Sequence, residues 1–224
     1  MLLPALPLGA AIVTAIFGKK VLGHAAHLPA MVAMPFAFVL SLALLLHVAR
    51  QVDQPHEGLG EPGGVAPAAT GTVGYEQVYT LWTWADIPDA IRLSGPPRES
   101  GTGPRPFSIE VSLRCDPLTC IMLAMVTFVS SLVVIYSIGY MHGDPGYWRF
   151  FSYVSLFVFS MTMLVSVSNF ALLYVFWEAV GVCSYLLIGY WFQKPEAAAA
   201  GKKAFLVNRI GDFGFALGIF LIWT

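Results

Sequence analysis

Six apolar runs, each close to the length of a membrane-crossing helix, constrain this chain more than any other feature of its sequence. A helix needs about 20 apolar residues to cross the ~30 Å hydrocarbon core of a bilayer. The runs cover residues 1–17, 28–49, 118–138, 150–167, 170–192 and 204–223. The third and fourth runs contain no charged residue. The pattern therefore predicts an all-α integral membrane protein with about six transmembrane helices.

The composition agrees with a membrane protein. Of 224 residues, 57% are hydrophobic and 11% are charged, against roughly 25% charged in an average soluble domain. The 12 basic and 13 acidic residues nearly cancel, so no nucleic-acid partner is expected. The cysteines, Cys115, Cys120 and Cys183, match neither a redox CxxC pair nor a zinc set. We expect no metal site, and we favour free thiols over a disulfide between Cys115 and Cys120.

Basic residues in the short connections set the expected orientation in the membrane. They follow the first, third and fifth runs, at Lys19, Lys20, Arg149, Lys194, Lys202 and Lys203. Residues 166–169, after the fourth run, contain none. Because cytoplasmic loops carry an excess of lysine and arginine, we predict a multi-pass protein of the cell (inner) membrane with its N-terminus on the outer side. A cleaved signal peptide is not favoured, since Lys19 and Lys20 follow the first run instead of preceding it.

A long segment separates the second and third predicted helices. It divides the chain into residues 1–50, 51–115 and 116–224. Residues 54–74 are rich in Gly, Pro and Ala, which predicts a flexible insertion. Residues 77–82 and 107–113 have strand-like composition, and the second stretch alternates apolar and polar residues. We predict a small β-hairpin on the outer surface, with its tip at 94–106.

Three ionisable residues other than histidine fall inside the predicted spans: Glu178, Arg209 and Asp212. A charge at the bilayer centre costs about 2.5–3.5 kcal/mol on insertion scales, so such residues face the protein interior and mark transport paths. Glu178 and Asp212 each lie eight residues inside their run, roughly 12 Å deep at ~1.5 Å per residue. Both are therefore predicted near the middle of the membrane.

The sequence does not decide whether these charges have a structural role or a role in ion transport. Arg209 and Asp212 are three residues apart, so they can form a purely structural ion pair on one helix face. Glu178 has no charged residue three or four positions away on its own helix, which suits a group that accepts and releases protons. Candidate supporting residues are Ser184, Tyr185, Lys202 and Lys203. Tyr174 and Trp177 are expected only to fill space.

Residues 174–214 carry a specific pattern. Trp177-Glu178 is followed by a run rich in small residues, and Asn-Arg-Ile-Gly-Asp occupies 208–212. Asp-Pro-Leu at 116–118 and Tyr-Ser-Ile-Gly-Tyr-Met at 136–141 fit the same pattern. This region resembles the antiporter-like chain 5 (chain L) membrane subunit of proton-pumping NADH:quinone oxidoreductase, respiratory complex I. The resemblance covers 107–224 well and the first two helices more loosely.

Several expectations come from this resemblance alone. The family has two inverted repeats, each centred on a broken helix. Glu178 would couple to a lysine on a seventh helix, and Arg209 and Asp212 would modulate that coupling in a subunit that links quinone reduction to proton transport. NADH, flavin, iron–sulfur clusters and quinone are expected on partner subunits, with no cofactor in this chain. The expected partners are the other membrane subunits and the lipid bilayer. Since family members have many more helices, we expect a fragment or a truncated product.

Three rival functions remain at this stage. The large subunit of a multi-subunit sodium/proton antiporter shares the same glutamate and the pattern on the sixth helix, and membrane-bound hydrogenase complexes contain similar chains. The Asn-Arg-Ile-Gly-Asp motif favours complex I. The neighbouring genes would distinguish complex I from the antiporter, because they would encode either quinone-reductase subunits or antiporter subunits. From another class, the chain could be a structural scaffold that moves no ions. A scaffold should tolerate Glu178→Gln, whereas a pump should lose proton transfer.

Overall fold

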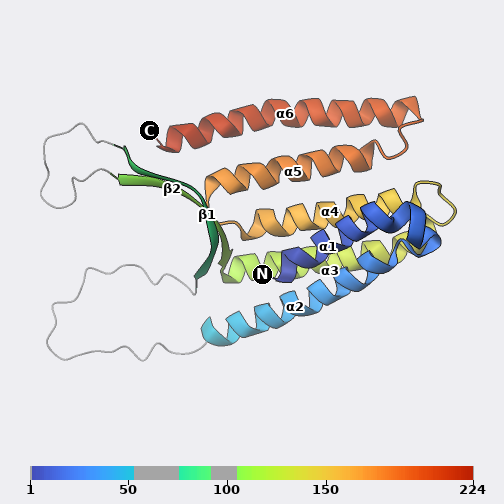
Figure 1. Ribbon diagram of the computed structural model, residues 1–224, viewed down its shortest axis with the longest axis horizontal. Helices are drawn as coiled ribbons and strands as arrows, with labels where there is room; N and C mark the ends of the chain where they lie inside the picture. Colours follow the sequence, from blue (N-terminus) through green and yellow to red (C-terminus); the bar gives the residue numbers. More distant parts are fainter. Residues whose placement is uncertain (1, 53–75, 92–104, 224) are drawn as a thin grey trace, which may run out of the picture.

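The computed structural model describes residues 2–52, 76–91 and 105–223 of this chain. Six long helices and one hairpin follow one another along the sequence. The helices are α1 (Leu2–Phe17), α2 (Leu28–Val52), α3 (Pro117–Tyr140), α4 (Tyr147–Ser166), α5 (Phe170–Ile188) and α6 (Pro195–Trp223). The strands β1 (Gln77–Ile91) and β2 (Arg105–Cys115) come between α2 and α3. The helices lie roughly parallel to one another, with the hairpin at one end (Figure 1).

All six predicted spans are confirmed as helices that are long and apolar enough to cross a membrane. The largest differences concern the connection between α5 and α6. Helix α6 begins at Pro195, before its apolar run, because proline suits a first helical turn and the alanines that follow favour helix. Helix α5 ends at Ile188, since the side chains of Tyr190 and Trp191 turn away to bind Asp144.

The predicted hairpin is confirmed, and its strands are longer than expected. β1 and β2 form a two-stranded antiparallel sheet whose pairing runs from Gln77 opposite Cys115 to Ile91 opposite Arg105. Three register shifts interrupt the pairing, and such irregularities bend a strand and increase its twist. Arg105 was predicted in the tip and instead begins β2. The predicted insertion at 54–74 and most of the predicted tip lie outside the described residues.

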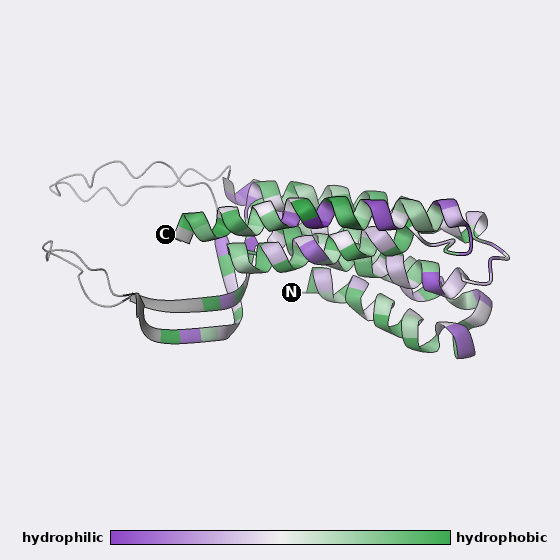
Figure 2. Ribbon diagram, turned by 90° about the horizontal axis from the view of Figure 1, so that it is seen from above, coloured by the Kyte–Doolittle hydropathy of each residue, from purple (hydrophilic) through white to green (hydrophobic). Residues whose placement is uncertain are grey.

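Helix α4 holds the centre of the bundle. It packs against α1, α3 and α5, while α2 packs against α1 and α3, and α6 against α5. The buried core joins residues of α2, α3 and α4: Ala30, Met34, Val134, Phe151, Val154 and Val158. Apolar residues occupy most of the helix lengths, and hydrophilic residues lie at the ends and connections and at a few positions within the helices (Figure 2). This distribution is the one that a lipid environment requires.

Small hydroxyl residues line the interior between the helices. Ser41 of α2 and Thr127 of α3 are hydrogen-bonded at 2.8 Å, and Ser152 of α4 donates to the carbonyl of Ala11 at 3.2 Å. In lipid, helix association depends on close packing and on hydrogen bonds between helices. At Gly18, directly after α1, an added Cβ would lie 2.8 Å from Cβ of Trp148. Only glycine therefore allows this approach of α1 to α4.

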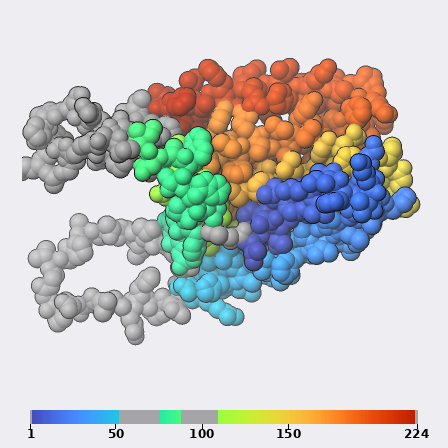
Figure 3. All heavy atoms as spheres, viewed as in Figure 1, coloured from blue at the N-terminus to red at the C-terminus, as the bar shows by residue number. Residues whose placement is uncertain are grey.

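The hairpin lies against the end of the bundle where α5 begins (Figures 1 and 3). Leu113 of β2 forms a bridge with Val167, and Ser112 is hydrogen-bonded to Ser168. Asn169 joins the two elements, because its amide nitrogen donates to the carbonyl of Glu110 at 2.6 Å and its amide oxygen caps α5 by accepting from Leu172 at 2.9 Å. The hairpin is thus attached to the first turn of α5.

The basic connections gather at the opposite end of the molecule. Lys19, the first-turn residue Arg149 of α4, and Lys194 line one cavity there. The turns between α1 and α2, α3 and α4, and α5 and α6 lie at the same end (Figure 1). The short connections with basic residues in or beside them therefore lie at one end of the bundle, and the short connection without them, between α4 and α5, lies at the other.

Candidate functional site

The three membrane-embedded charges meet between α5 and α6. The guanidinium of Arg209 donates from Nη1 to the carboxylate of Glu178 in a short contact. The same nitrogen lies 3.9 Å from Oδ2 of Asp212, three residues further along α6. The sequence left open whether Arg209 pairs with Asp212 or reaches Glu178. In the structure the stronger contact is the one between the helices, to Glu178.

The cluster is placed at depth by both helices. Glu178 lies eight residues from the start of α5, and Asp212 eleven residues from the end of α6 at Trp223. At ~1.5 Å per residue these positions are roughly 12 and 16 Å from the hairpin end of the bundle. The exposed fractions of the side chains are 18% for Glu178, 7% for Asp212 and 45% for Arg209. The two acids are therefore shielded, and the shared cation is the most open member.

Each carboxylate also has an aromatic hydrogen-bond donor on α5. The hydroxyl of Tyr174 donates to Glu178 Oε1 at 3.0 Å, and the indole nitrogen of Trp177 donates to Asp212 Oδ1 at 2.8 Å. The expectation that Tyr174 and Trp177 only fill space is wrong. The four-residue spacing of Tyr174 and Glu178, which places them on one helix face, was the available signal. No spacing rule could have found the contact of Trp177, because it crosses to another helix.

Aromatic rings form the surroundings of the cluster. Phe215 packs against the rings of both Tyr174 and Trp177, with centroids 6.0 and 5.8 Å apart. The guanidinium carbon of Arg209 lies 4.7 Å from the ring centroid of Phe205, a cation–π contact. These rings fix the orientation of the donors and the cation.

A cavity of about 420 Å³ adjoins the cluster on the side of Asp212. Its polar lining comes from Trp177 and Ser184 of α5 and from Asn208 and Asp212 of α6. The predicted position of Ser184 beside a cavity agrees with this lining, although its hydroxyl donates to the carbonyl of Val180 at 2.8 Å. Asn208 was not singled out from the sequence as a site residue. A cavity with these groups has room and hydrogen-bonding partners for water.

The other candidate supporting residues lie apart from the charges. Tyr185 packs against Phe205, with ring centroids 5.5 Å apart. Lys202 and Lys203 are exposed on α6, and within residues 2–52, 76–91 and 105–223 they form no ion pair with Glu178 or Asp212. The structure therefore brings together Glu178, Arg209 and Asp212 but does not add these two lysines to them.

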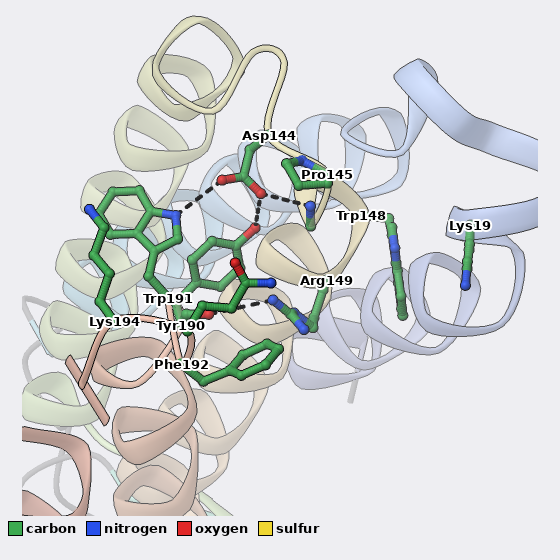
Figure 4. A pocket seen from close by; sticks show the side chains of 11 residues that line it. Lys19, Asp144, Pro145, Trp148, Arg149, Tyr190, Trp191, Phe192 and Lys194 are labelled. Carbon is green, nitrogen blue, oxygen red and sulfur yellow. Dashed lines mark hydrogen bonds between the residues drawn. The ribbon is translucent and has the colours of Figure 1, made fainter. Parts of the chain in front are cut away.

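A second polar cluster holds the connections together at the basic end (Figure 4). Asp144 accepts hydrogen bonds from the Tyr190 hydroxyl at 2.8 Å, the Trp191 indole nitrogen at 3.0 Å and the Gly146 amide at 2.7 Å. Burial acts to raise the pKa of Asp144, but these three donors and the nearby charge of Arg149 outweigh it and hold that pKa below its usual range. Asp144 thus braces the connection between α3 and α4 against the one between α5 and α6.

Metal binding finds no support in the described part of the chain. Among residues 2–52, 76–91 and 105–223, no group of three His, Cys, Asp or Glu side chains could hold a metal ion. The cluster itself consists of two carboxylates, one guanidinium, a phenol and an indole.

Two family models match the second half of the chain. A family model described as NADH-ubiquinone oxidoreductase (complex I), chain 5 N-terminus, matches residues 103–151. A second, described as NADH:quinone oxidoreductase/Mrp antiporter, TM, matches residues 166–224 and so includes all three charges. The second half of this chain is thus similar to membrane subunits of complex I and of Mrp antiporters.

Curated relatives of this family are similar to half of the chain. The chain is 58% identical over 119 residues, 53% of its length, to NAD(P)H-quinone oxidoreductase subunit 5, chloroplastic, of Chlorokybus atmophyticus. It is 60% identical over 111 residues, 50% of its length, to the protein of that name from Anthoceros angustus. The matched segments span 18% and 15% of these relatives' own length. The resemblance seen in the sequence is thereby confirmed over this half of the chain.

Proposed function

We propose that this chain forms part of a proton-translocating, antiporter-like membrane subunit of NADH:quinone oxidoreductase, and that Glu178, Arg209 and Asp212 carry the proton-coupled step. The observation that carries the proposal is the Arg209 contact with both carboxylates, in a segment that matches the NADH:quinone oxidoreductase/Mrp antiporter family model. Charges at this depth are retained where they transport ions or control transport.

The geometry supports a switch of one cation between two acids. While Glu178 is ionised, Arg209 stays on it, because opposite charges about 4 Å apart attract by about 4 kcal/mol at an effective dielectric constant of 20. Protonation of Glu178 removes that attraction and leaves Asp212, 3.9 Å away, as the nearest anion to Arg209. A proton on Glu178 would thus shift the guanidinium toward the side of the cavity that Asp212 and Ser184 line.

Partners and location follow from the proposed function. The chain would contact other membrane subunits of the complex and the lipid bilayer. NADH, flavin, iron–sulfur clusters and quinone would bind to partner subunits. The gathering of Lys19, Arg149 and Lys194 at one end supports an orientation with that end in the cytoplasm and the N-terminus outside, in the inner membrane of a cell.

The test is proton pumping, measured beside NADH oxidation, in membranes whose full-length parent protein carries Glu178→Gln. We expect an assembled complex with strongly reduced pumping, since glutamine keeps the shape and the Tyr174 contact but cannot exchange a proton. Glu196→Gln is the matched control, because Glu196 is an exposed carboxylate in the first turn of α6. Normal pumping in the Glu178→Gln complex would contradict the role of Glu178 and favour a scaffold.

A sodium/proton antiporter is the second candidate function. The family model over residues 166–224 carries both descriptions, quinone oxidoreductase and Mrp antiporter. Sodium dependence separates them: a pump of complex I should form a proton gradient from NADH in sodium-free buffer, whereas an antiporter should need sodium and no NADH. The names of the curated relatives favour the first outcome.

A further inference from the structure

Two thiols meet where the hairpin joins the helical bundle. Cys115 is the last residue of β2, and Cys120 lies in the first turn of α3. Their Sγ atoms are 3.5 Å apart, and both cysteines are free. Cys120 is fully buried, whereas Cys115 is half-buried and lines a cavity of about 190 Å³ together with His47 and Tyr79. One thiol can therefore be reached from outside and the other lies directly behind it.

The cap of α3 creates this contact. The carboxylate of Asp116 is the N-cap and accepts from the amide of Thr119 at 2.6 Å. Cys115 then stands one residue before the cap and Cys120 four residues after it, the two positions whose side chains pack together in a hydrophobic staple. Arg114 lies 3.0 Å from Asp116 and 3.1 Å from Glu76, so the charge of the capping carboxylate is balanced. The backbone thus holds the sulfurs in contact without a covalent bond.

We propose that Cys115 and Cys120 form a reversible dithiol–disulfide pair, with a small or protein disulfide as the oxidant. The thiolate of Cys115 attacks one sulfur of the oxidant, a mixed disulfide forms and the first thiol of the oxidant leaves. The thiolate of Cys120 then attacks the Cys115 sulfur, and the second thiol leaves. The two protons released by the cysteines pass to the leaving thiolates. The chain loses two electrons, and the oxidant gains them.

The stereochemistry of the pair permits this reaction. A disulfide requires about 2.05 Å between the sulfurs, so the 3.5 Å contact must shorten by about 1.5 Å. Rotation about the side-chain bonds of the two cysteines is the movement that would bring the sulfurs together. With the orientation expected from the basic connections, the hairpin end faces the non-cytoplasmic compartment, where disulfides persist.

The bond would brace the junction between β2 and α3, and the hairpin already links this junction to α5. Cys115 ends the strand that reaches Val167 through Leu113 and Asn169 through Glu110. Asn169 in turn caps α5, the helix that carries Glu178. Oxidation would thus stiffen a continuous path from the start of α3 to the start of α5, and reduction would release it.

The test is differential thiol labelling of the full-length protein in its native membranes. Membranes are treated with oxidised glutathione or with a reductant, denatured in N-ethylmaleimide, then reduced and labelled with isotopically heavy maleimide for peptide mass spectrometry. We expect heavy label on both Cys115 and Cys120 after oxidation and on neither after reduction. Cys183 is the internal control, because it is buried on α5 with Ser160 Oγ as its 3.9 Å neighbour.

The variant Cys120→Ser separates a disulfide within the chain from simple thiol modification. In this variant the first step can occur but the second cannot, so Cys115 should retain a glutathione adduct that wild type lacks. A lasting glutathione adduct on wild-type Cys115 would overturn the proposal, and so would N-ethylmaleimide on both cysteines after oxidation. The labelling does not depend on proton pumping, so its outcome is independent of the proposed function.

Discussion

The contact between Arg209 and Glu178 can be tested quantitatively by a double-mutant cycle. Removing one partner of a buried ion pair costs about 3–5 kcal/mol, because the remaining charge stays buried without a counter-charge. Arg209→Gln creates that situation for Glu178, whose side chain is 18% exposed. The side chain of Arg209 is itself 45% exposed, and screening lowers the attraction of an open group. We therefore expect a coupling of about 2 kcal/mol between Glu178→Gln and Arg209→Gln.

The assay is equilibrium unfolding of the purified full-length protein in detergent micelles with increasing SDS. The four free energies of unfolding, for wild type, each single variant and the double variant, are compared at one SDS fraction. The double variant should be more stable than the sum of the single effects predicts. The matched control is the cycle of Arg209→Gln with Asp212→Asn, where the 3.9 Å separation predicts a coupling below about 1 kcal/mol. Additive effects for Glu178, or a larger coupling for Asp212, would refute the described pairing.

Three further changes test other contacts. Tyr174→Phe removes the donor to the Glu178 carboxylate and should lower the free energy of unfolding by about 1.5–3 kcal/mol; an unchanged value in SDS unfolding would rule out that bond. Asn169→Ala removes both the N-cap of α5 and the link to the hairpin. We expect the free energy of unfolding to fall by about 2 kcal/mol and amide hydrogen exchange in β2 to become faster. Asn169→Ser should keep the cap. The pKa of Asp144 is lower in the folded state than in the unfolded state. Its contribution to the free energy of unfolding is therefore fully present above the unfolded pKa of about 3.9 and is lost as the pH falls through the lower folded pKa. Asp144→Asn should therefore be less stable than wild type near pH 6, and stability measured from pH 6 to 3 should fall less in the variant.

Much of the fold could be predicted from the sequence, because a bilayer leaves few alternatives to a helix for a long apolar run. The boundaries were less predictable where local chemistry decides. Helix α6 starts at Pro195 because alanine and proline preferences extend it beyond the apolar run, and α5 ends early because Tyr190 binds Asp144. The alternation in β2 identified the hairpin, but the register shifts that allow longer strands come from pairing with β1.

The residues of the site were predictable, but their connections were not. Glu178, Arg209 and Asp212 stand out because charge is rare inside a span. Which acid Arg209 contacts depends on how α5 and α6 rotate against each other, and no periodicity within one helix reports that rotation. The same holds for Trp177, whose partner Asp212 is 35 residues away.

The hydrogen bonds inside the bundle have a consequence for how the chain enters a bilayer. Thr127, Ser131 and Ser160 each donate to a carbonyl one turn earlier in their own helix, so these hydroxyls are satisfied before any helices meet. Glu178 differs, because Arg209, the counter-charge described for it, lies on the other helix. A single charge costs about 2.5–3.5 kcal/mol at the bilayer centre. Biosynthetic insertion should therefore release α3 and α4 one at a time, but deliver α5 and α6 to the lipid as a joined pair.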